Sequence, residues 1–133
     1  MAHKHILLID DDDDIRTVAG ISLETIGDWR VSSAAGGREG IAIAIAEQPD
    51  AILCDVMMPD LDGPETVARL QADPATRDIP VILLTARVLA ADRERFAGLG
   101  IAGMLFKPFD PMMLSNDVDA ILARQPAEPA PVS

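Results

Sequence analysis

Acidic side chains follow two short apolar segments of the chain. Asp10 and Asp11 open a run of five aspartates that ends at Asp14, and Asp55 directly follows the second apolar segment. If Asp10, Asp11 and Asp55 lie together, each pair of carboxylates about 4 Å apart repels by roughly 4 kcal/mol at an effective dielectric constant of about 20. Such a cluster either keeps one carboxyl protonated or binds a cation. Because the ligand atoms are all oxygens, Mg²⁺ or Mn²⁺ suits the cluster better than zinc.

A hydroxyl and an ammonium group follow two further apolar segments. Thr85 comes after Val81–Leu84, and Lys107 comes after Met104–Phe106. The chain has nine arginines but only two lysines, so a lysine in this place indicates a need for a compact point charge. A divalent cation beside a carboxylate, a hydroxyl and an ammonium group is typical of sites that handle phosphoryl groups. The carboxylate itself can then act as the nucleophile and form an aspartyl phosphate.

Each of these residues also has a purely structural interpretation. We expect Asp12 to Asp14 to cap a helix and to favour its dipole, rather than to take part in chemistry. Asp55 also fits a turn residue, Thr85 a strand end and Lys107 a surface lysine. Residue types alone leave these alternatives open.

The segments that position these residues alternate between strand-like and helix-like patterns. Four strand candidates lack polar alternation, which is typical of strands covered on both faces. The exception, Trp29–Ser33, is expected at an edge of the sheet. The predicted strands are His5–Ile9, Trp29–Ser33, Ala51–Cys54, Val81–Leu84 and Met104–Phe106.

Helical patterns lie between these strands. The alternating Ile and Ala residues from Ile41 fit a strand or a helix, and the flanking Gly36-Gly37 and Pro49 favour the helix. Strands that alternate with helices predict an α/β fold, a doubly wound parallel sheet of five strands with helices on both faces. The predicted helices are Asp14–Ile26, the segment from Ile41, Pro64–Ala72, Ala90–Gly98 and Pro111–Arg124.

The length and composition restrict the function classes. A chain of 133 residues suits one compact domain, here residues 1–124, and the Pro/Ala-rich residues 125–133 are predicted to be a disordered tail. The net charge of −11 argues against nucleic-acid binding, which needs a basic surface. Cys54 is the only cysteine, which excludes an internal disulfide and a cysteine-rich zinc site. Acidic residues soon follow the first apolar run, so we expect neither a signal peptide nor a membrane span, and a cytoplasmic location.

Four motifs resemble those of the receiver domain of bacterial two-component response regulators. They are ILLIDDDDDIR, DAILCDVMMPDLDG, PVILLTA and MLFKPFD, and the resemblance runs from about Ile6 to Arg124. It implies the flavodoxin-like (βα)5 receiver fold, with strand order 2-1-3-4-5, of chemotaxis-type single-domain regulators. It also implies a signalling domain rather than an enzyme. Such a domain takes a phosphoryl group from a sensor histidine kinase or a histidine phosphotransfer protein.

The resemblance implies roles for the acidic residues. Asp55 is the phosphoacceptor. Asp11, Asp55 and the backbone carbonyl of Met57 hold Mg²⁺ directly, and Asp10 helps through water. Phosphorylation adds about −1.5 to −2 charge units at Asp55.

The resemblance also implies a phosphoryl-binding pair and a switch. Thr85 and Lys107 contact the phosphoryl oxygens, and Pro108 follows Lys107 in a cis-type turn. Thr85 then moves inward and changes the surface made by the fourth helix, the fifth strand and the fifth helix. The switch partner is Met104, where the family usually has Tyr or Phe; a thioether fills the pocket less definitely, which weakens the expected coupling. Met57 and Arg87 lie where the family tunes the phosphoryl lifetime.

We predict a stand-alone receiver, because no DNA-binding helix-turn-helix fits after Lys107. Its output is then a contact with a downstream protein or onward transfer in a phosphorelay, from a monomer or a phosphorylation-dependent homodimer. One alternative is a pseudo-receiver, a docking module of the same fold that phosphorylation does not control. A remote alternative is a Mg²⁺-dependent phosphatase of the haloacid dehalogenase type. It also uses an aspartate nucleophile, but it needs a late acidic pair that this chain lacks.

Two further motifs carry no site. Asp60–Gly63 is not part of an EF-hand calcium loop, because Met58, two residues before it, stands where such a loop needs an oxygen ligand. Cys54 lies within an apolar strand, so an inert core thiol is expected there.

Overall fold

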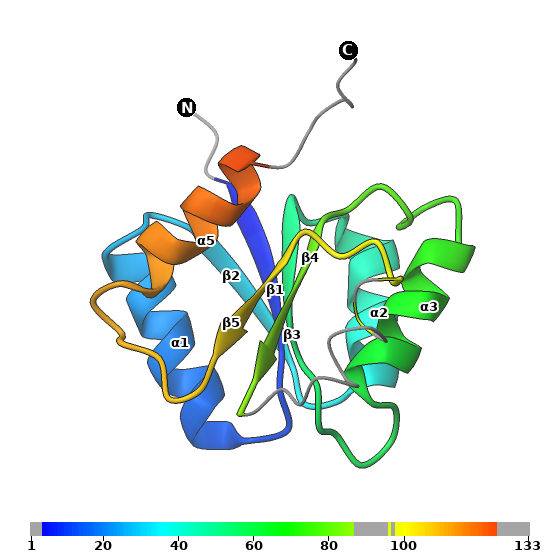
Figure 1. The fold of residues 1–133 in the computed structure, drawn as a ribbon, viewed down its shortest axis with the longest axis horizontal. Helices are drawn as coiled ribbons and strands as arrows, with labels where there is room; N and C mark the ends of the chain where they lie inside the picture. The colour runs from blue at the N-terminus through cyan, green and yellow to red at the C-terminus, as the bar shows by residue number, and fades with distance from the viewer. Residues whose placement is uncertain (1–3, 87–95, 97, 125–133) are drawn as a thin grey trace.

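The computed structural model describes residues 4–86, 96 and 98–124 of the chain, and Figure 1 shows its fold. Five parallel strands form one sheet in the order β2-β1-β3-β4-β5. The predicted fold class, a doubly wound five-stranded parallel α/β sheet, is therefore confirmed. The strands are β1 (His5–Ile9), β2 (Arg30–Ala34), β3 (Ala51–Asp55), β4 (Val81–Thr85) and β5 (Gly103–Phe106), and the helices are α1 (Asp13–Thr25), α2 (Gly37–Glu47), α3 (Gly63–Ala72) and α5 (Leu114–Arg124).

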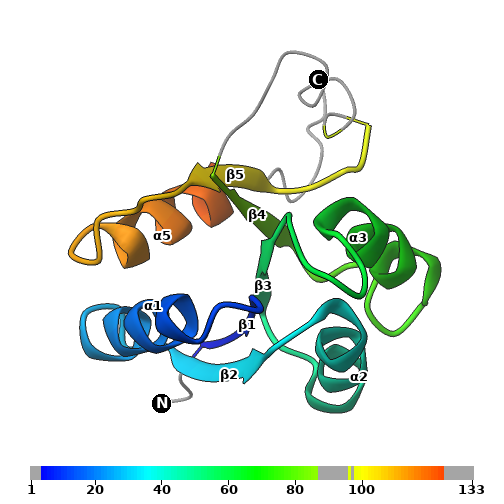
Figure 2. The ribbon, with the colours of Figure 1, turned by 90° about the horizontal axis from the view of Figure 1, so that it is seen from below.

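Helices cover both faces of the sheet. Figure 2 shows α1 and α5 against one face and α2 and α3 against the other. Leu7 and Ile52 belong to the core cluster on the side of α2 and α3, whereas Ile6 and Leu53 belong to the cluster on the side of α1 and α5. Every residue of β1, β3 and β4 is buried, which explains why these strands are apolar except for one end residue each, namely His5, Asp55 and Thr85.

The two outer strands are less buried than the three inner ones. β2 lies at one edge of the sheet, as its pattern predicted, and only its Ala34 is fully buried. β5 lies at the other edge of the described sheet, none of its residues is fully buried, and Phe106 is 51% exposed. The prediction that this strand is covered on both faces is wrong, because an edge strand is screened by the sheet on one side only.

α1 and α3 begin one residue before their predicted starts, and the starts of α2 and α5 differ by more. α2 begins at Gly37, within the glycine pair that was expected to precede the helix, and the distant carboxylate of Asp60 caps its first turn. α5 begins at Leu114 rather than Pro111, after a turn closed by Asp110. The helix predicted at Ala90–Gly98 lies almost entirely outside the described residues, and the predicted tail lies wholly outside them. Among the described helices, none has the length and apolar character needed to cross a membrane.

Candidate functional site

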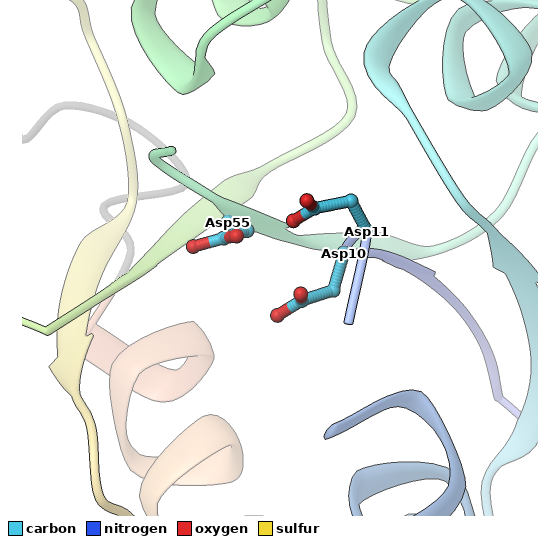
Figure 3. Close-up of side chains that lie close together, drawn as sticks. All are labelled: Asp10, Asp11 and Asp55. Carbon is cyan, nitrogen blue, oxygen red and sulfur yellow. The ribbon is translucent and has the colours of Figure 1, made fainter. Parts of the chain in front are cut away.

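Three carboxylates converge at the carboxyl-terminal end of the sheet. Asp10 and Asp11 follow β1, and Asp55 ends the neighbouring strand β3 (Figure 3). One oxygen from each residue lies within 4.8 Å of the other two. β1 is the strand at which the chain order reverses, since β2 lies on one side of it and β3 on the other. Ligands of open α/β sheets bind at such a reversal, so the cluster predicted from the sequence lies where a binding site is expected.

Asp10 is fully buried and is held from several sides. Its Oδ1 accepts a hydrogen bond of 2.9 Å from the backbone N–H of Asp12, and its backbone carbonyl accepts one of 2.6 Å from Arg16. Its Oδ2 lies 3.1 Å from Nζ of Lys107 and accepts no hydrogen bond from any other described group. A buried carboxylate oxygen in this state favours a nearby cation.

Lys107 supplies the positive charge of the site. Its Nζ lies 3.1 Å from Asp10 Oδ2 and 3.2 Å from Asp55 Oδ1. Lys107 directly follows β5, and its backbone N–H donates a 2.8 Å hydrogen bond to the carbonyl of Thr85, the last residue of β4. The peptide bond between Lys107 and Pro108 is cis, as the resemblance implied. The residue types predicted at the ends of four strands are therefore brought together at one end of the sheet.

Burial and neighbouring charges shift the pKa values of two of these groups. Burial, together with the charge of Asp10, raises the pKa of Asp55 from 3.8 to about 6, although Lys107 and a backbone hydrogen bond from Met57 oppose this rise. Burial alone lowers the pKa of Lys107, but its interactions with Asp10 and Asp55 outweigh burial and raise this pKa overall. Lys107 is therefore an ammonium ion at neutral pH, and Asp55 is mostly ionised there.

The raised pKa of Asp55 predicts that this residue destabilises the metal-free fold as the pH rises from about 4 to about 6. In this range the native carboxyl binds a proton that the unfolded chain has released, so its contribution is present in acid and is lost as the native carboxyl ionises. A shift of this size corresponds to about 3 kcal/mol. In urea unfolding with EDTA, we expect Asp55→Asn to gain about that much relative to the natural chain between about pH 4 and pH 7. A stability difference that does not change with pH contradicts this assignment.

The cluster has the composition of a Mg²⁺ or Mn²⁺ site. Its ligand atoms are carboxylate oxygens, which hard divalent cations prefer. Three carboxylates and one ammonium leave two negative charges in excess. Asp11 is exposed, so the site is open to water on its side. The residues present therefore fit a divalent cation that keeps water ligands.

The rest of the acidic run serves the helix that follows it. Asp12 is the N-cap of α1, and its side chain accepts hydrogen bonds from the backbone N–H groups of Asp14 and Ile15. Asp13 lies in the first turn and pairs with Arg16. The capping role predicted for these aspartates is confirmed for Asp12. The sequence analysis missed the role of Arg16. Its guanidinium donates a hydrogen bond to the backbone carbonyl of Asp10 and so holds the acidic loop in place.

The loop after Asp55 joins the site to two helices. Asp60 accepts hydrogen bonds of 3.1 and 3.0 Å from the backbone N–H groups of Gly37 and Arg38 at the start of α2, which lowers the pKa of Asp60. Asp62 is the N-cap of α3 in a capping box with Glu65. These two aspartates therefore cap helices. No local pattern signals this role for Asp60, whereas Asp62 followed by Glu65 is a capping-box pattern that the sequence analysis overlooked.

Gly63 allows this loop to pack closely against β3. A Cβ added at Gly63 would lie 2.9 Å from the Cα of Val56 and 3.0 Å from the carbonyl oxygen of Asp55. The backbone N–H of Gly63 donates a 2.8 Å hydrogen bond to the Val56 carbonyl. The phosphoacceptor candidate is thus held by a turn that leaves no room for a side chain.

The remaining predicted residues have clear positions. Met57 is 74% exposed beside Asp55, and Met104 is half-buried beside β4, opposite Leu83 rather than opposite Thr85. Thr85 is buried and lies opposite Phe106. Arg87 lies outside the described residues.

Cys54 lies in the core, as predicted. It is fully buried, and this burial, together with the charges of Asp55 and Asp10, raises the pKa of its thiol. An inert core thiol is the consequence.

Comparison with known proteins identifies relatives of the chain. Residues 6–119 match the family model of the response regulator receiver domain. The DNA-binding dual master transcriptional regulator RpaA of Synechocystis sp. is 40% identical over 119 residues, which cover 90% of this chain and 49% of that protein. The phosphate regulon transcriptional regulatory protein PhoB of Pseudomonas aeruginosa is 34% identical over 93% of this chain and 54% of its own length. The chain thus spans about half the length of the curated relatives it matches.

Solved structures share the fold. The chemotaxis protein CheY4 of Vibrio cholerae superposes with a TM-score of 0.85 at 29% identity, over 90% of this chain and 99% of that one. The receiver domain of the sensor histidine kinase PA1611 of Pseudomonas aeruginosa has a TM-score of 0.79 at 33% identity, over 96% of this chain and all of the other. That structure is described with a magnesium ion coordinated in the active-site cleft.

Proposed function

We propose that Asp55 accepts a phosphoryl group, because the chain belongs to the family of response regulator receiver domains of two-component systems. The donor is a phosphohistidine of a sensor kinase or of a histidine phosphotransfer protein. The observation that carries this proposal is the convergence of Asp10, Asp11 and Asp55 with Lys107 at one end of the sheet.

The residues of the site have complementary parts in the transfer. A carboxylate oxygen of Asp55 forms a bond to phosphorus while the bond from phosphorus to the donor's imidazole nitrogen breaks, and the departing nitrogen takes up a proton. Asp55 must be ionised to attack, and a pKa of about 6 leaves it ionised at neutral pH. Lys107, 3.2 Å from Asp55 Oδ1, offers positive charge to the phosphoryl oxygens, and the Thr85 hydroxyl offers a hydrogen bond.

Asp11, Asp55 and the backbone carbonyl of Met57 would hold Mg²⁺ directly, with Asp10 acting through water. When bound, the ion neutralises negative charge on the carboxylates and on the phosphoryl oxygens. The excess negative charge of the cluster supports this arrangement. The domain is therefore a signalling element that catalyses only its own phosphorylation and dephosphorylation.

The proposal predicts that a small acyl phosphate and Mg²⁺ together phosphorylate the protein. Intact mass spectrometry is expected to show a gain of one phosphoryl group when both are present, and none when EDTA replaces Mg²⁺, because the excess charge of the cluster then repels the donor. Absence of any gain with several donors, in a protein whose circular dichroism is native, contradicts the proposal. That result favours the pseudo-receiver.

The phosphorylated domain then signals through contacts with a downstream protein or by onward transfer of the phosphoryl group. The proposed location of the protein is the cytoplasm. The net charge of −11 supports protein rather than nucleic-acid partners for this chain. Thr85 and Met104 are the proposed switch, and phosphorylation-dependent pairing of two copies is a further form of output.

A further inference from the structure

Two exposed arginines line a groove between α2 and α3, on the sheet face opposite α1 and α5. Arg38 comes from the first turn of α2 and Arg69 from α3, and the groove of about 350 Å³ is also lined by Ile41 and Ala72. Ile45 lies one turn beyond Ile41 on the same face of α2 and is 43% exposed. The groove therefore combines two positive charges with apolar side chains.

Neither guanidinium forms an ion pair within the part of the chain that the structure describes, and three carboxylates near them in the sequence or the fold bind backbone N–H groups instead. Glu65 and Asp73 stand four residues before and after Arg69. The first accepts a hydrogen bond from the backbone in the capping box of α3, and the second accepts one in the turn after that helix. Asp60, which lies at the backbone of Arg38, caps α2. Both arginine head groups are left available in a protein that carries a net charge of −11.

We propose that this groove docks an acidic, amphipathic segment of a partner protein. Carboxylates of the segment pair with Arg38 and Arg69, and its apolar side chains contact Ile41 and Ala72. Arginine suits this role because its planar fork binds a carboxylate through two parallel hydrogen bonds.

The charge distribution favours a protein segment over a nucleic acid. Binding to a phosphate backbone needs many positive charges spread along a surface, and this groove offers two in an acidic molecule. The apolar lining has no counterpart on a phosphate backbone, whereas it matches the apolar side of an amphipathic helix.

A titration of the ¹⁵N-labelled full chain with a synthetic peptide tests the proposal. In the peptide, glutamates flank leucines at helical spacing. The largest shift changes are expected at the backbone amides of α2 and α3, and the affinity is expected to fall at least about tenfold in Arg38→Glu and in Arg69→Glu. Arg124→Glu is the matched control. It makes the same charge change at an exposed residue of α5, which covers the opposite face of the sheet (Figure 2), and should leave the affinity within about twofold. No phosphodonor is present, so the outcome does not depend on the proposed function.

Four results overturn the proposal. The first is the absence of shift changes on α2 and α3 up to millimolar peptide, with the fold intact. The second is equal binding of a peptide with lysine in place of glutamate. The third is equal binding of single-stranded DNA at the same residues, which makes the groove a general polyanion site. The fourth is self-association that Arg38→Glu abolishes, which makes the occupant a second copy of this chain.

Discussion

Replacing Asp55 with asparagine is expected to abolish phosphoryl uptake while the fold stays intact. The amide that replaces the carboxylate has no anionic oxygen to attack phosphorus, so uptake from an acyl phosphate should fall by roughly a thousandfold or more. The variant also removes one of the carboxylates that crowd Lys107, and it should therefore be no less stable than the natural chain at neutral pH. Intact mass spectrometry with Mg²⁺ and chemical denaturation check the two halves of this expectation.

Asp14→Asn is the matched control for this variant. Asp14 lies in the same acidic run, three residues past Asp11, but is exposed in the first turn of α1, outside the cluster. The Asp14→Asn variant should therefore take up a phosphoryl group at the rate of the natural chain. Equal uptake by Asp55→Asn and the natural chain would place the acceptor at another residue and refute the assignment.

Replacing Lys107 with methionine is expected to lower both stability and phosphorylation. Methionine keeps the aliphatic stem but removes the charge, which leaves fully buried Asp10 facing Asp55 without a cation. Breaking a buried pair in this way costs about 3 kcal/mol. Loss of one positive charge aimed at the phosphoryl oxygens should slow uptake by about a hundredfold or more. Saturating Mg²⁺ should restore part of the stability, because it binds the folded site and replaces the missing positive charge.

The other lysine provides the comparison. Lys4 lies at the amino-terminal end of β1, at the opposite end of the sheet, where its Nζ is 5.5 Å from the centre of the Trp29 ring. Lys4→Met should change neither the uptake rate nor the response to Mg²⁺, and its stability cost should stay within about 1 kcal/mol. If Lys107→Met is as stable as Lys4→Met, the ion pairs at the site do not hold Asp10 as described.

The site could be predicted from residue order because the chemistry lies at strand ends. Parallel strands bring their carboxyl ends to one side of the sheet, so residue types just after each apolar run were enough to assemble Asp10, Asp11, Asp55 and Lys107. The inner strands were predictable to within one residue, because burial on both faces leaves them continuously apolar.

Other features depended on contacts that no local pattern reports. Asp60 caps α2 from more than twenty residues away, and no pattern near α2 signals this contact. Arg16 looked like an ordinary helix residue, yet it binds the carbonyl of Asp10. The partial exposure of β5 follows from its place at the edge of the described sheet. Strand order decides that place, and it entered the sequence argument only through the family resemblance.

Locating the acyl phosphate in the chain tests the central claim most directly. Borohydride reduces an aspartyl phosphate to homoserine, so protein treated with acyl phosphate and Mg²⁺, then reduced and digested, carries a permanent mark at the acceptor. Peptide mass spectrometry is expected to find homoserine at position 55 and unmodified aspartate at positions 10 and 11. Homoserine at another aspartate, with Asp55 unchanged, would contradict the account.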